Sequence, residues 1–420
     1  MKVNRRTFVG AAAAAAGALM SAPAVIGQTR PRVVVIGGGA GGATAARYLA
    51  RDSAGALDVT LVEASPVYTT CFFSNLYLGG VRSFESLQHG YDRIGADVRV
   101  THDSATAVDP AARTVTLAGG ASLPYERLVL SPGIDFREGS VPGWGLADAE
   151  IMPHAYKAGP QTQLLKAMVQ AMPQGGVFAM VAPPNPYRCP PGPYERVSMV
   201  ANLLKQSNPT AKILIFDPKT KFSKQALFEE GWGLHYDGMI EWINAEFGGG
   251  DVAVRPATME VVVEGAAQRV DVCNVIPAQI AGRIAALAGV TDDSGWAPAL
   301  PEDMRSRADP NIHVLGDASA QGDMPKSAFS ANSQAKVAAM AIRGDLTGSR
   351  VFPARYANTC WSLIAPDDGV KVGASYEPTP EKIASVHSFI SATGEDAALR
   401  RATFEESLGW YAGITADIFG

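Results

Sequence analysis

The chain has 420 residues, which is long for one hydrophobic core and predicts two or three domains. Apolar residues make up 47% of it and charged residues 18%, a composition typical of a soluble globular protein. The formal net charge is −5, from 36 basic and 41 acidic residues. This acidic balance disfavours nucleic acid as a partner.

The first 28 residues have the features of an export signal. A twin-arginine pattern at 4–9 is followed by an alanine-rich apolar run to Met20 and by small residues at 21–24 that suit cleavage. The run is too short to span a bilayer, so no stable membrane insertion is predicted. The pattern predicts that the folded protein is exported to the periplasm. The alternative is an alanine helix that begins the fold.

The cysteines are few and widely spaced, at Cys71, Cys189, Cys273 and Cys360. An oxidising compartment permits a disulfide, but four cysteines allow three full pairings. The sequence has no Cys-x-x-Cys pair and no Cys-x-x-Cys-His motif for haem attachment, and its six histidines are scattered. It therefore predicts no metal site, and any haem that takes part belongs to another chain.

A strand, a glycine turn and a helix follow one another after the predicted signal. Residues 32–36 form an apolar, β-branched run that predicts a buried strand, and 43–50 have the composition of a helix. Between them, Gly37 permits a tight turn, Gly39 lets the backbone approach a pyrophosphate, and Gly42 lets the helix pack on the strand. This pattern predicts a dinucleotide-binding unit.

The next strand and two later stretches favour FAD as the dinucleotide. Residues 58–62 predict a second strand, and Glu63 follows it where a carboxylate accepts from a ribose hydroxyl. The stretches 125–133 and 311–317 resemble strands with which glutathione-reductase-like flavoproteins complete their FAD domain. That resemblance implies that Asp317 binds the ribityl chain of FAD. The alternative is that its carboxylate only caps a helix.

A second strand pair lacks the glycine turn of a nicotinamide site. Residues 176–181 and 212–217 predict strands of a βαβ unit. The loop after the first of them has six prolines at 183–193, and proline has no N–H group to offer a pyrophosphate. We predict that this loop disfavours a helix start, holds Cys189 and Glu195 on an extended path, and serves thiol chemistry in place of NAD binding.

The predicted fold is α/β, with two Rossmann-like domains of the FAD/NAD(P) type and a C-terminal α+β domain. The predicted segments are a twin-arginine signal peptide at 1–28, an FAD-binding domain at 29–142 and 284–345, a second nucleotide-binding-like domain without a glycine loop at 143–283, and the C-terminal domain at 346–420.

Three cysteine-containing segments resemble the flavoprotein subunit of flavocytochrome c sulfide dehydrogenase, within the glutathione-reductase-like FAD and disulfide family. They are 67–75 around Cys71, the loop at 188–196, and 358–360. The likeness covers nearly the whole mature chain. It includes three further stretches whose residues suggest no chemistry by themselves, at 87–92, 220–224 and 419–420.

The resemblance implies a role for three of the cysteines. Cys71 would bind the 8α-methyl carbon of FAD as a thioether, and its alternative is a buried free thiol. Cys189 and Cys360 would form a redox disulfide beside the flavin, although a purely structural disulfide stays open. Cys273, inside the apolar stretch 272–276, is predicted to be an inert core thiol.

Two further residues are candidates for the same site. Glu195 would be a general base with a raised pKa, because a carboxylate near an apolar flavin site loses hydration. Its alternative role is a salt bridge with Arg188 or Arg196. Trp410 would stack near the flavin, and ordinary core packing is the alternative.

The function implied by the resemblance is oxidation of hydrosulfide to sulfur or polysulfide. Electrons would pass through the disulfide and FAD to haem on a c-type cytochrome subunit. Which cysteine is attacked first stays open. One alternative is a sulfide:quinone oxidoreductase, which the lack of a long basic amphipathic helix at 346–420 and the export signal both disfavour. Another is a non-catalytic flavoprotein that reactivates the thiols of a sulfur-carrier protein.

Overall fold

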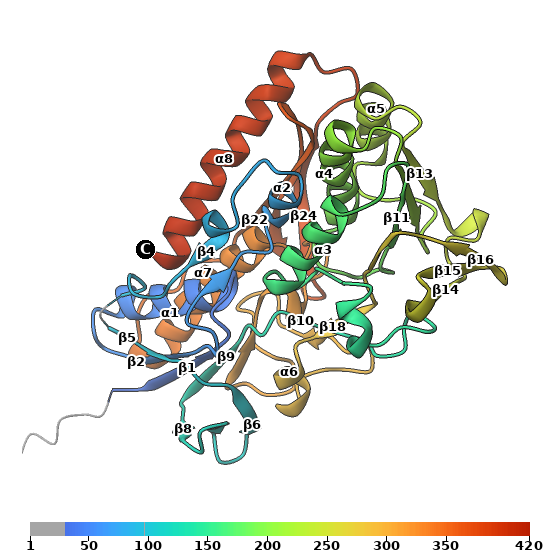
Figure 1. Cartoon of the computed structure of the whole chain (residues 1–420). Coiled ribbons are helices and arrows are strands. Elements are labelled where there is room, and N and C mark those ends of the chain that lie inside the picture. Colours follow the sequence, from blue (N-terminus) through green and yellow to red (C-terminus); the bar gives the residue numbers. More distant parts are fainter. Residues whose placement is uncertain (1–29, 96) are drawn as a thin grey trace, which may run out of the picture. The chain divides into compact units, whose positions relative to one another are not determined.

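The computed structural model describes residues 30–95 and 97–420, so the predicted signal peptide at 1–28 lies outside the described residues. Pro31–Gly420 form one compact unit, which Figure 1 shows coloured along the sequence. The domain boundaries predicted inside this unit stay predictions. No helix within the described ranges is both long and apolar enough to cross a membrane.

The first sheet is parallel and has the strand order β20-β9-β1-β2-β5. Val33 and Val35 of its central strand are fully buried, as expected where both faces of a parallel sheet are covered. Helices α1 (Ala40–Ser53) and α7 (Ala328–Thr347) pack against each other beside it (Figure 1). The strands are β1 (Arg32–Ile36), β2 (Asp58–Val62), β5 (Val98–Thr101), β9 (Arg127–Leu130) and β20 (Ile312–Val314).

The second sheet is also parallel, with the order β13-β12-β11-β17, and it contains both strands predicted for a βαβ unit. Its strands are β11 (Val177–Val181), β12 (Lys212–Phe216), β13 (Ile240–Ile243) and β17 (Val272–Val275). The neighbouring helices are α3 (Pro160–Gln170), α4 (Gly192–Ser207) and α5 (Gln225–His235).

The prediction that the proline-rich loop disfavours a helix start is wrong. Helix α4 begins at Gly192, inside the proline-rich stretch, and Pro193 lies in its first turn. Proline suits that position because the N–H group there has no partner within the helix and the ring already holds a helical φ. Glu195 therefore lies in the first turn of a helix, and Cys189 has a left-handed φ of +55°, so neither residue lies on the predicted extended path.

The C-terminal segment folds into an antiparallel sheet and a long helix. The sheet consists of β22 (Tyr356–Ala365), β23 (Asp368–Pro378) and β24 (Ile383–Ile390). Helix α8 (Ala397–Phe419), red in Figure 1, packs on β23, β22 and α1. The sequence did not indicate a helix of this length. Its charges are mixed, since Glu405 and Glu406 follow Arg400 and Arg401.

The remaining elements are short and connect or flank the two parallel sheets. The paired strands are β3 (Tyr68–Thr69) with β4 (Gln88–His89), β10 (Ile134–Phe136) with β18 (Gln279–Ala281), β19 (Ala297–Pro298) with β21 (Ser319–Ala320), β6 (Ala105–Asp109) with β7 (Thr114–Leu117) and β8 (Ser122–Pro124), and β14 (Val252–Arg255) with β15 (Glu260–Val263) and β16 (Ala266–Arg269). Short α-helices in the described part of the chain are α2 (Ser74–Leu78) and α6 (Arg283–Leu287).

Candidate functional site

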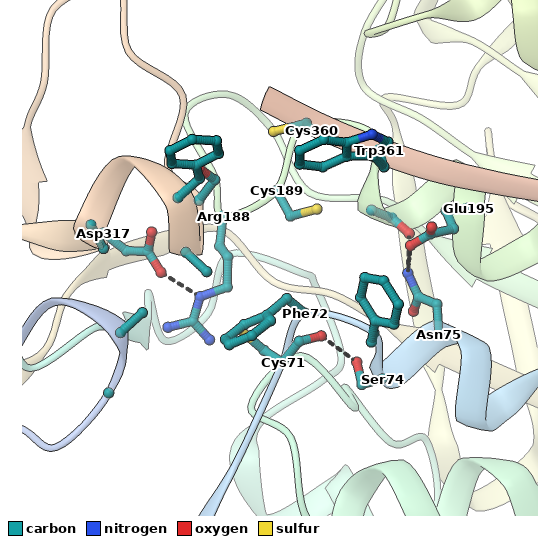
Figure 2. Close-up of a pocket in the computed structure, with 18 of the residues that line it drawn as sticks. Cys71, Phe72, Ser74, Asn75, Arg188, Cys189, Glu195, Asp317, Cys360 and Trp361 are labelled. Carbon is teal, nitrogen blue, oxygen red and sulfur yellow. Dashed lines mark hydrogen bonds and ion pairs between the residues drawn. The ribbon is translucent and has the colours of Figure 1, made fainter. Parts of the chain in front are cut away.

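One cavity extends from the glycine turn after β1 to the thiol of β22. Figure 2 shows its walls, which come from segments that are far apart in the sequence. Tertiary folding thus gathers most of the residues predicted from the sequence. The predicted residues that line the cavity are Gly39, Cys71, Cys189, Glu195, Asp317, Cys360 and Trp410.

The glycine turn has the close packing predicted for it. Gly37 has a φ of +99°, and a Cβ atom there would lie 2.3 Å from the carbonyl oxygen of Ser131. A Cβ atom on Gly42 would lie 1.8 Å from the carbonyl oxygen of Gly37. Both positions therefore require glycine, because any side chain would clash with the backbone of this tight strand-to-helix turn. Gly39 precedes helix α1 at the cavity, where free N–H groups of a helix start favour an anion.

Glu63 supports the same turn. Its two carboxylate oxygens accept hydrogen bonds from the backbone N–H groups of Gly38, at 2.7 Å, and Ser65, at 3.0 Å. The side chain follows β2 and so bridges the ends of the first two strands. The predicted contact with a ribose hydroxyl stays a prediction.

Asp317 forms an ion pair with an arginine that the sequence did not assign to the flavin site. The Nε atom of Arg188 lies 2.6 Å from Oδ2 of Asp317, while Oδ1 of Asp317 is buried without a hydrogen-bond partner (Figure 2). The side chain caps no helix. A buried carboxylate oxygen without a partner is costly, so this atom is available to accept from a ligand hydroxyl.

All four cysteines are free thiols in this structure. Cys273 is fully buried, which confirms its predicted place in the core, and burial raises its pKa to about 12. Cys189 and Cys360 line the same cavity, and burial raises the pKa of both. Cys71 is half-buried there, and burial also raises its pKa. The disulfide between Cys189 and Cys360 stays a prediction.

Cys189 has a backbone conformation that side chains rarely adopt. Its φ is +55°, in the left-handed region. The conformation is held by a hydrogen bond from its N–H group to the carbonyl oxygen of Lys326, at 2.8 Å, and by the Gly192 N–H group, which donates to the Cys189 carbonyl oxygen at 2.7 Å. Strain of this kind concentrates at functional sites.

Glu195 has partners other than the arginines considered from the sequence. Its carboxylate accepts from the Asn75 side-chain amide at 2.8 Å and from the Leu363 backbone N–H group at 2.9 Å. Arg188 pairs instead with Asp317. Arg196 donates to backbone carbonyls and to asparagine side chains. Burial raises the pKa of Glu195 above its ordinary value although these hydrogen bonds oppose the shift.

Lys224 is a buried cation beside the two cysteines, and no pattern in the sequence indicated a role for it. Its ammonium donates to the Cys360 carbonyl oxygen at 3.1 Å and to the Ser362 hydroxyl at 2.7 Å. Burial lowers the pKa of Lys224 to about 8, while negative charge on Cys360, Glu195 or Cys189 would raise it. By the same interaction, its positive charge stabilises a thiolate on either cysteine.

Trp410 lines the cavity and also packs in an aromatic cluster. Its ring centroid lies 5.1 Å from that of Trp361 and 5.9 Å from that of Phe72. The packing alternative is therefore present in the structure, and the predicted stacking near a flavin stays a prediction.

Comparison with known proteins identifies the family. A pyridine nucleotide-disulphide oxidoreductase model matches 31–164, the central model of the sulfide dehydrogenase (flavocytochrome c) flavoprotein chain matches 162–277, and the flavocytochrome c sulphide dehydrogenase flavin-binding model matches 353–419. A curated relative, the sulfide dehydrogenase (flavocytochrome c) flavoprotein chain of Chlorobaculum thiosulfatiphilum, is 54% identical over 44 residues, which are 10% of this chain and 90% of the relative. The chain belongs to this family of flavoprotein chains.

Solved structures agree on the fold. A sulfide:quinone oxidoreductase from Aquifex aeolicus superposes with a TM-score of 0.67 and 20% identity, covering 93% of this chain and 92% of that one. The putidaredoxin reductase–putidaredoxin complex gives 0.64 at 17% identity, covering 90% and 94%. The flavoprotein chain thus has the mixed α/β fold of pyridine-nucleotide disulfide oxidoreductases.

The residues of the cavity fit FAD, the cofactor that the flavin-binding family model indicates. The free N–H groups at the start of α1 suit its pyrophosphate, and the unpartnered oxygen of Asp317 suits a ribityl hydroxyl. Arg188 would hold the charge of Asp317 in place.

Changing Asp317 to asparagine tests this fit. We expect Asp317→Asn to weaken FAD binding about ten- to hundredfold, because a hydrogen bond to a carboxylate is worth more than one to an amide. Titration of FAD into apoprotein carrying Cys71→Ala measures the affinity without a covalent link. Asp251→Asn, at an exposed position, is the matched control. Equal affinities in the two variants would contradict the assignment.

In the second parallel sheet of the flavoprotein chain, side chains of the protein already bind the acid that a nicotinamide cofactor would need. Asp217, directly after β12, accepts from the Tyr194 hydroxyl at 2.5 Å and from the Trp242 indole at 3.0 Å. Lys219 pairs with the same carboxylate at 2.6 Å and donates to the Pro183 carbonyl oxygen. These contacts occupy the Asp217 carboxylate and, with the missing glycine turn, disfavour NAD binding.

Lys224 offers a second test within the flavoprotein chain. We expect Lys224→Met to raise the pKa of the Cys360 thiol further, because a thiolate there loses the stabilising positive charge of Lys224. The rate of alkylation of Cys360 against pH gives this pKa in the reduced protein. Below about pH 8 the wild type keeps the positive charge of Lys224. The difference between the two proteins in the alkylation rate of Cys360 is therefore largest there, and it shrinks as pH rises through 8. Lys221→Met changes an exposed lysine of the same segment and should match the wild type.

Proposed function

We propose that this flavoprotein chain oxidises hydrosulfide to zero-valent sulfur or polysulfide through a redox disulfide between Cys189 and Cys360. The observation that supports this most is that both thiols line one cavity with the residues suited to FAD. Family membership supports the same activity. The twin-arginine pattern at 4–9 supports a periplasmic location.

The chain's own residues account for the sulfur chemistry. Hydrosulfide attacks one sulfur of the disulfide, which gives a persulfide on that cysteine and releases the other as a thiolate. Glu195 accepts a proton from the sulfur nucleophile, since a carboxylate with a raised pKa is a competent base near neutral pH. Lys224 stabilises the thiolate. FAD, when bound, supplies a two-electron acceptor that can release electrons singly to the haem of a cytochrome c subunit.

An acceptor test separates this function from its alternatives. The purified FAD-loaded protein is given sulfide together with cytochrome c, a quinone or NAD. We expect bleaching of the flavin by sulfide and reduction of cytochrome c. Reduction of the quinone alone would indicate a sulfide:quinone oxidoreductase. A flavin that sulfide does not bleach would indicate the accessory role in reactivating a sulfur carrier.

Cys71 is proposed to hold the flavin covalently as a thioether. When the holoprotein is precipitated with acid, we expect the yellow colour to stay in the pellet, whereas in Cys71→Ala it should move to the supernatant. Cys273→Ala removes a buried thiol that does not line the cavity and should behave as the wild type does. Flavin released from the wild-type protein would refute the covalent link.

A further inference from the structure

The guanidinium of Arg188 is fixed inside the cavity that the residues suited to FAD line. Its Nε atom donates to Oδ2 of Asp317 at 2.6 Å, and its Nη1 atom donates to the Tyr156 carbonyl oxygen at 3.2 Å. The Arg188 backbone N–H group donates to the Gln279 side chain at 2.8 Å, which holds the base of the side chain. Only 15% of the Arg188 side chain is exposed, so the guanidinium has little freedom to turn away.

The remaining end of this guanidinium is the one that is free to act on a neighbour. The two side-chain hydrogen bonds leave Nη2 without an acceptor among the described residues. A Cβ atom on Gly133 would lie 2.9 Å from Nη2, so the glycine leaves the space that this group occupies. Figure 2 shows the guanidinium between Asp317 and Cys71, close enough to the thiol for its charge to act there.

The charges around Cys71 have opposite signs. The titratable groups that face it in the described part of the chain are Tyr68, Cys189, Tyr411, Arg188 and Asp317. Burial raises the pKa of the two tyrosines and of Cys189, which are therefore neutral near pH 7. Burial also raises the pKa of Cys71 itself. The positive charge of Arg188 opposes that shift more strongly than the carboxylate of Asp317 adds to it.

A thioether between Cys71 and FAD requires the thiolate of Cys71, because the thiolate and not the thiol is the nucleophile. We propose that Arg188 assists the covalent attachment of FAD by stabilising the Cys71 thiolate before the bond forms. This role rests on the proposed function, of which the covalent link to Cys71 is a part. It assigns an arginine of the proline-rich loop to the maturation of the holoprotein.

The attachment step is an oxidation and reduction within the complex. Sγ of Cys71 supplies the electron pair of the new bond to the 8α carbon, and one C–H bond of that carbon breaks. The electron pair of the C–H bond passes to the ring system of FAD, and the proton goes to solvent. FAD is thereby reduced by two electrons. Dioxygen or oxidised cytochrome c accepts these two electrons and returns the attached FAD to its oxidised state.

The pH dependence of attachment tests this role. Full-length apoprotein from cells starved of riboflavin is mixed with saturating FAD, and the flavin that stays with acid-precipitated protein is followed over time. We expect Arg188→Met to slow attachment about tenfold at pH 7, because less of the Cys71 thiol is ionised. The difference should shrink as pH rises, since the thiolate then forms without help. Arg188→Lys keeps the positive charge and should restore most of the rate.

A second variant covers the risk that Arg188→Met does not fold, because it leaves the buried carboxylate of Asp317 unpaired. Arg188→Met combined with Asp317→Asn removes both charges. In this apoprotein we expect alkylation of Cys71, followed by mass spectrometry of its peptide, to begin at higher pH than in the wild type, since the larger of the two opposing effects is lost. Arg99→Met removes an exposed arginine that pairs with Asp58 outside the cavity, and should match the wild type.

The outcomes separate this role from the proposed function. Attachment that Arg188→Met leaves unchanged, or slows by the same factor at every pH, would overturn the role of Arg188, as would an unshifted alkylation profile in the double variant. Wild-type protein that attaches no flavin would overturn the covalent link, and the role with it. Sulfide-dependent reduction of cytochrome c by protein with bound FAD is measured separately, so a failure of sulfide oxidation is distinguished from both.

Discussion

Replacing Cys189 or Cys360 with serine is expected to lower sulfide-dependent reduction of cytochrome c by about a thousandfold or more, as loss of a nucleophile or leaving group does in other enzymes. Serine can neither form the disulfide nor leave as a stable anion, so the first step has no pathway. FAD should stay bound, because its proposed attachment is to Cys71 and the residues suited to its other contacts are unchanged. Steady-state rates and the flavin absorbance of each purified variant measure the two effects.

The matched control is Cys273→Ser. Cys273 is fully buried in β17 and does not line the cavity, so its replacement should change the melting temperature more than the rate. Folding of the two active-site variants is checked by their melting curves, because Cys360 is also buried. A serine variant that keeps a tenth or more of the wild-type rate would exclude a disulfide mechanism.

Glu195→Gln is expected to lower the rate about a hundredfold, within the range found when a general base is removed. Glutamine keeps the size of the side chain but cannot take up the proton. It also places an NH₂ group against one of two hydrogen-bond donors, Asn75 or the Leu363 N–H group, which costs roughly 1–3 kcal/mol of stability. The pH dependence separates the catalytic effect from the structural one.

The wild-type rate should fall as pH falls through the raised pKa of Glu195, because the protonated carboxyl group cannot act as a base. This acidic limb lies above the ordinary range of a glutamate and should be absent from the pH profile of Glu195→Gln. Glu229→Gln, on the exposed face of α5, is the control and should keep the limb. A Glu195→Gln profile with the limb unchanged would show that another group titrates.

The amino-acid sequence determined the features that depend on neighbouring residues. The turn between β1 and α1 was predicted because Gly37 and Gly42 act within a few residues of each other, and the structure confirms their close packing. Strands β11 and β12 of the second sheet and the burial of Cys273 were predicted for the same reason, since short apolar runs indicate buried strands. The helix start at Gly192 was missed because proline was treated as a helix breaker at a position where it is favoured.

Only the tertiary structure decided which distant side chains meet. Cys189 and Cys360 share a cavity although the sequence itself could not pair them. Arg188 likewise forms an ion pair with Asp317, which is 129 residues away in the sequence. Lys224 carried no signal in the sequence, because a lysine is ordinarily exposed and its burial depends on where β22 lies. Contacts of this kind follow from the packing of whole elements and not from local propensity.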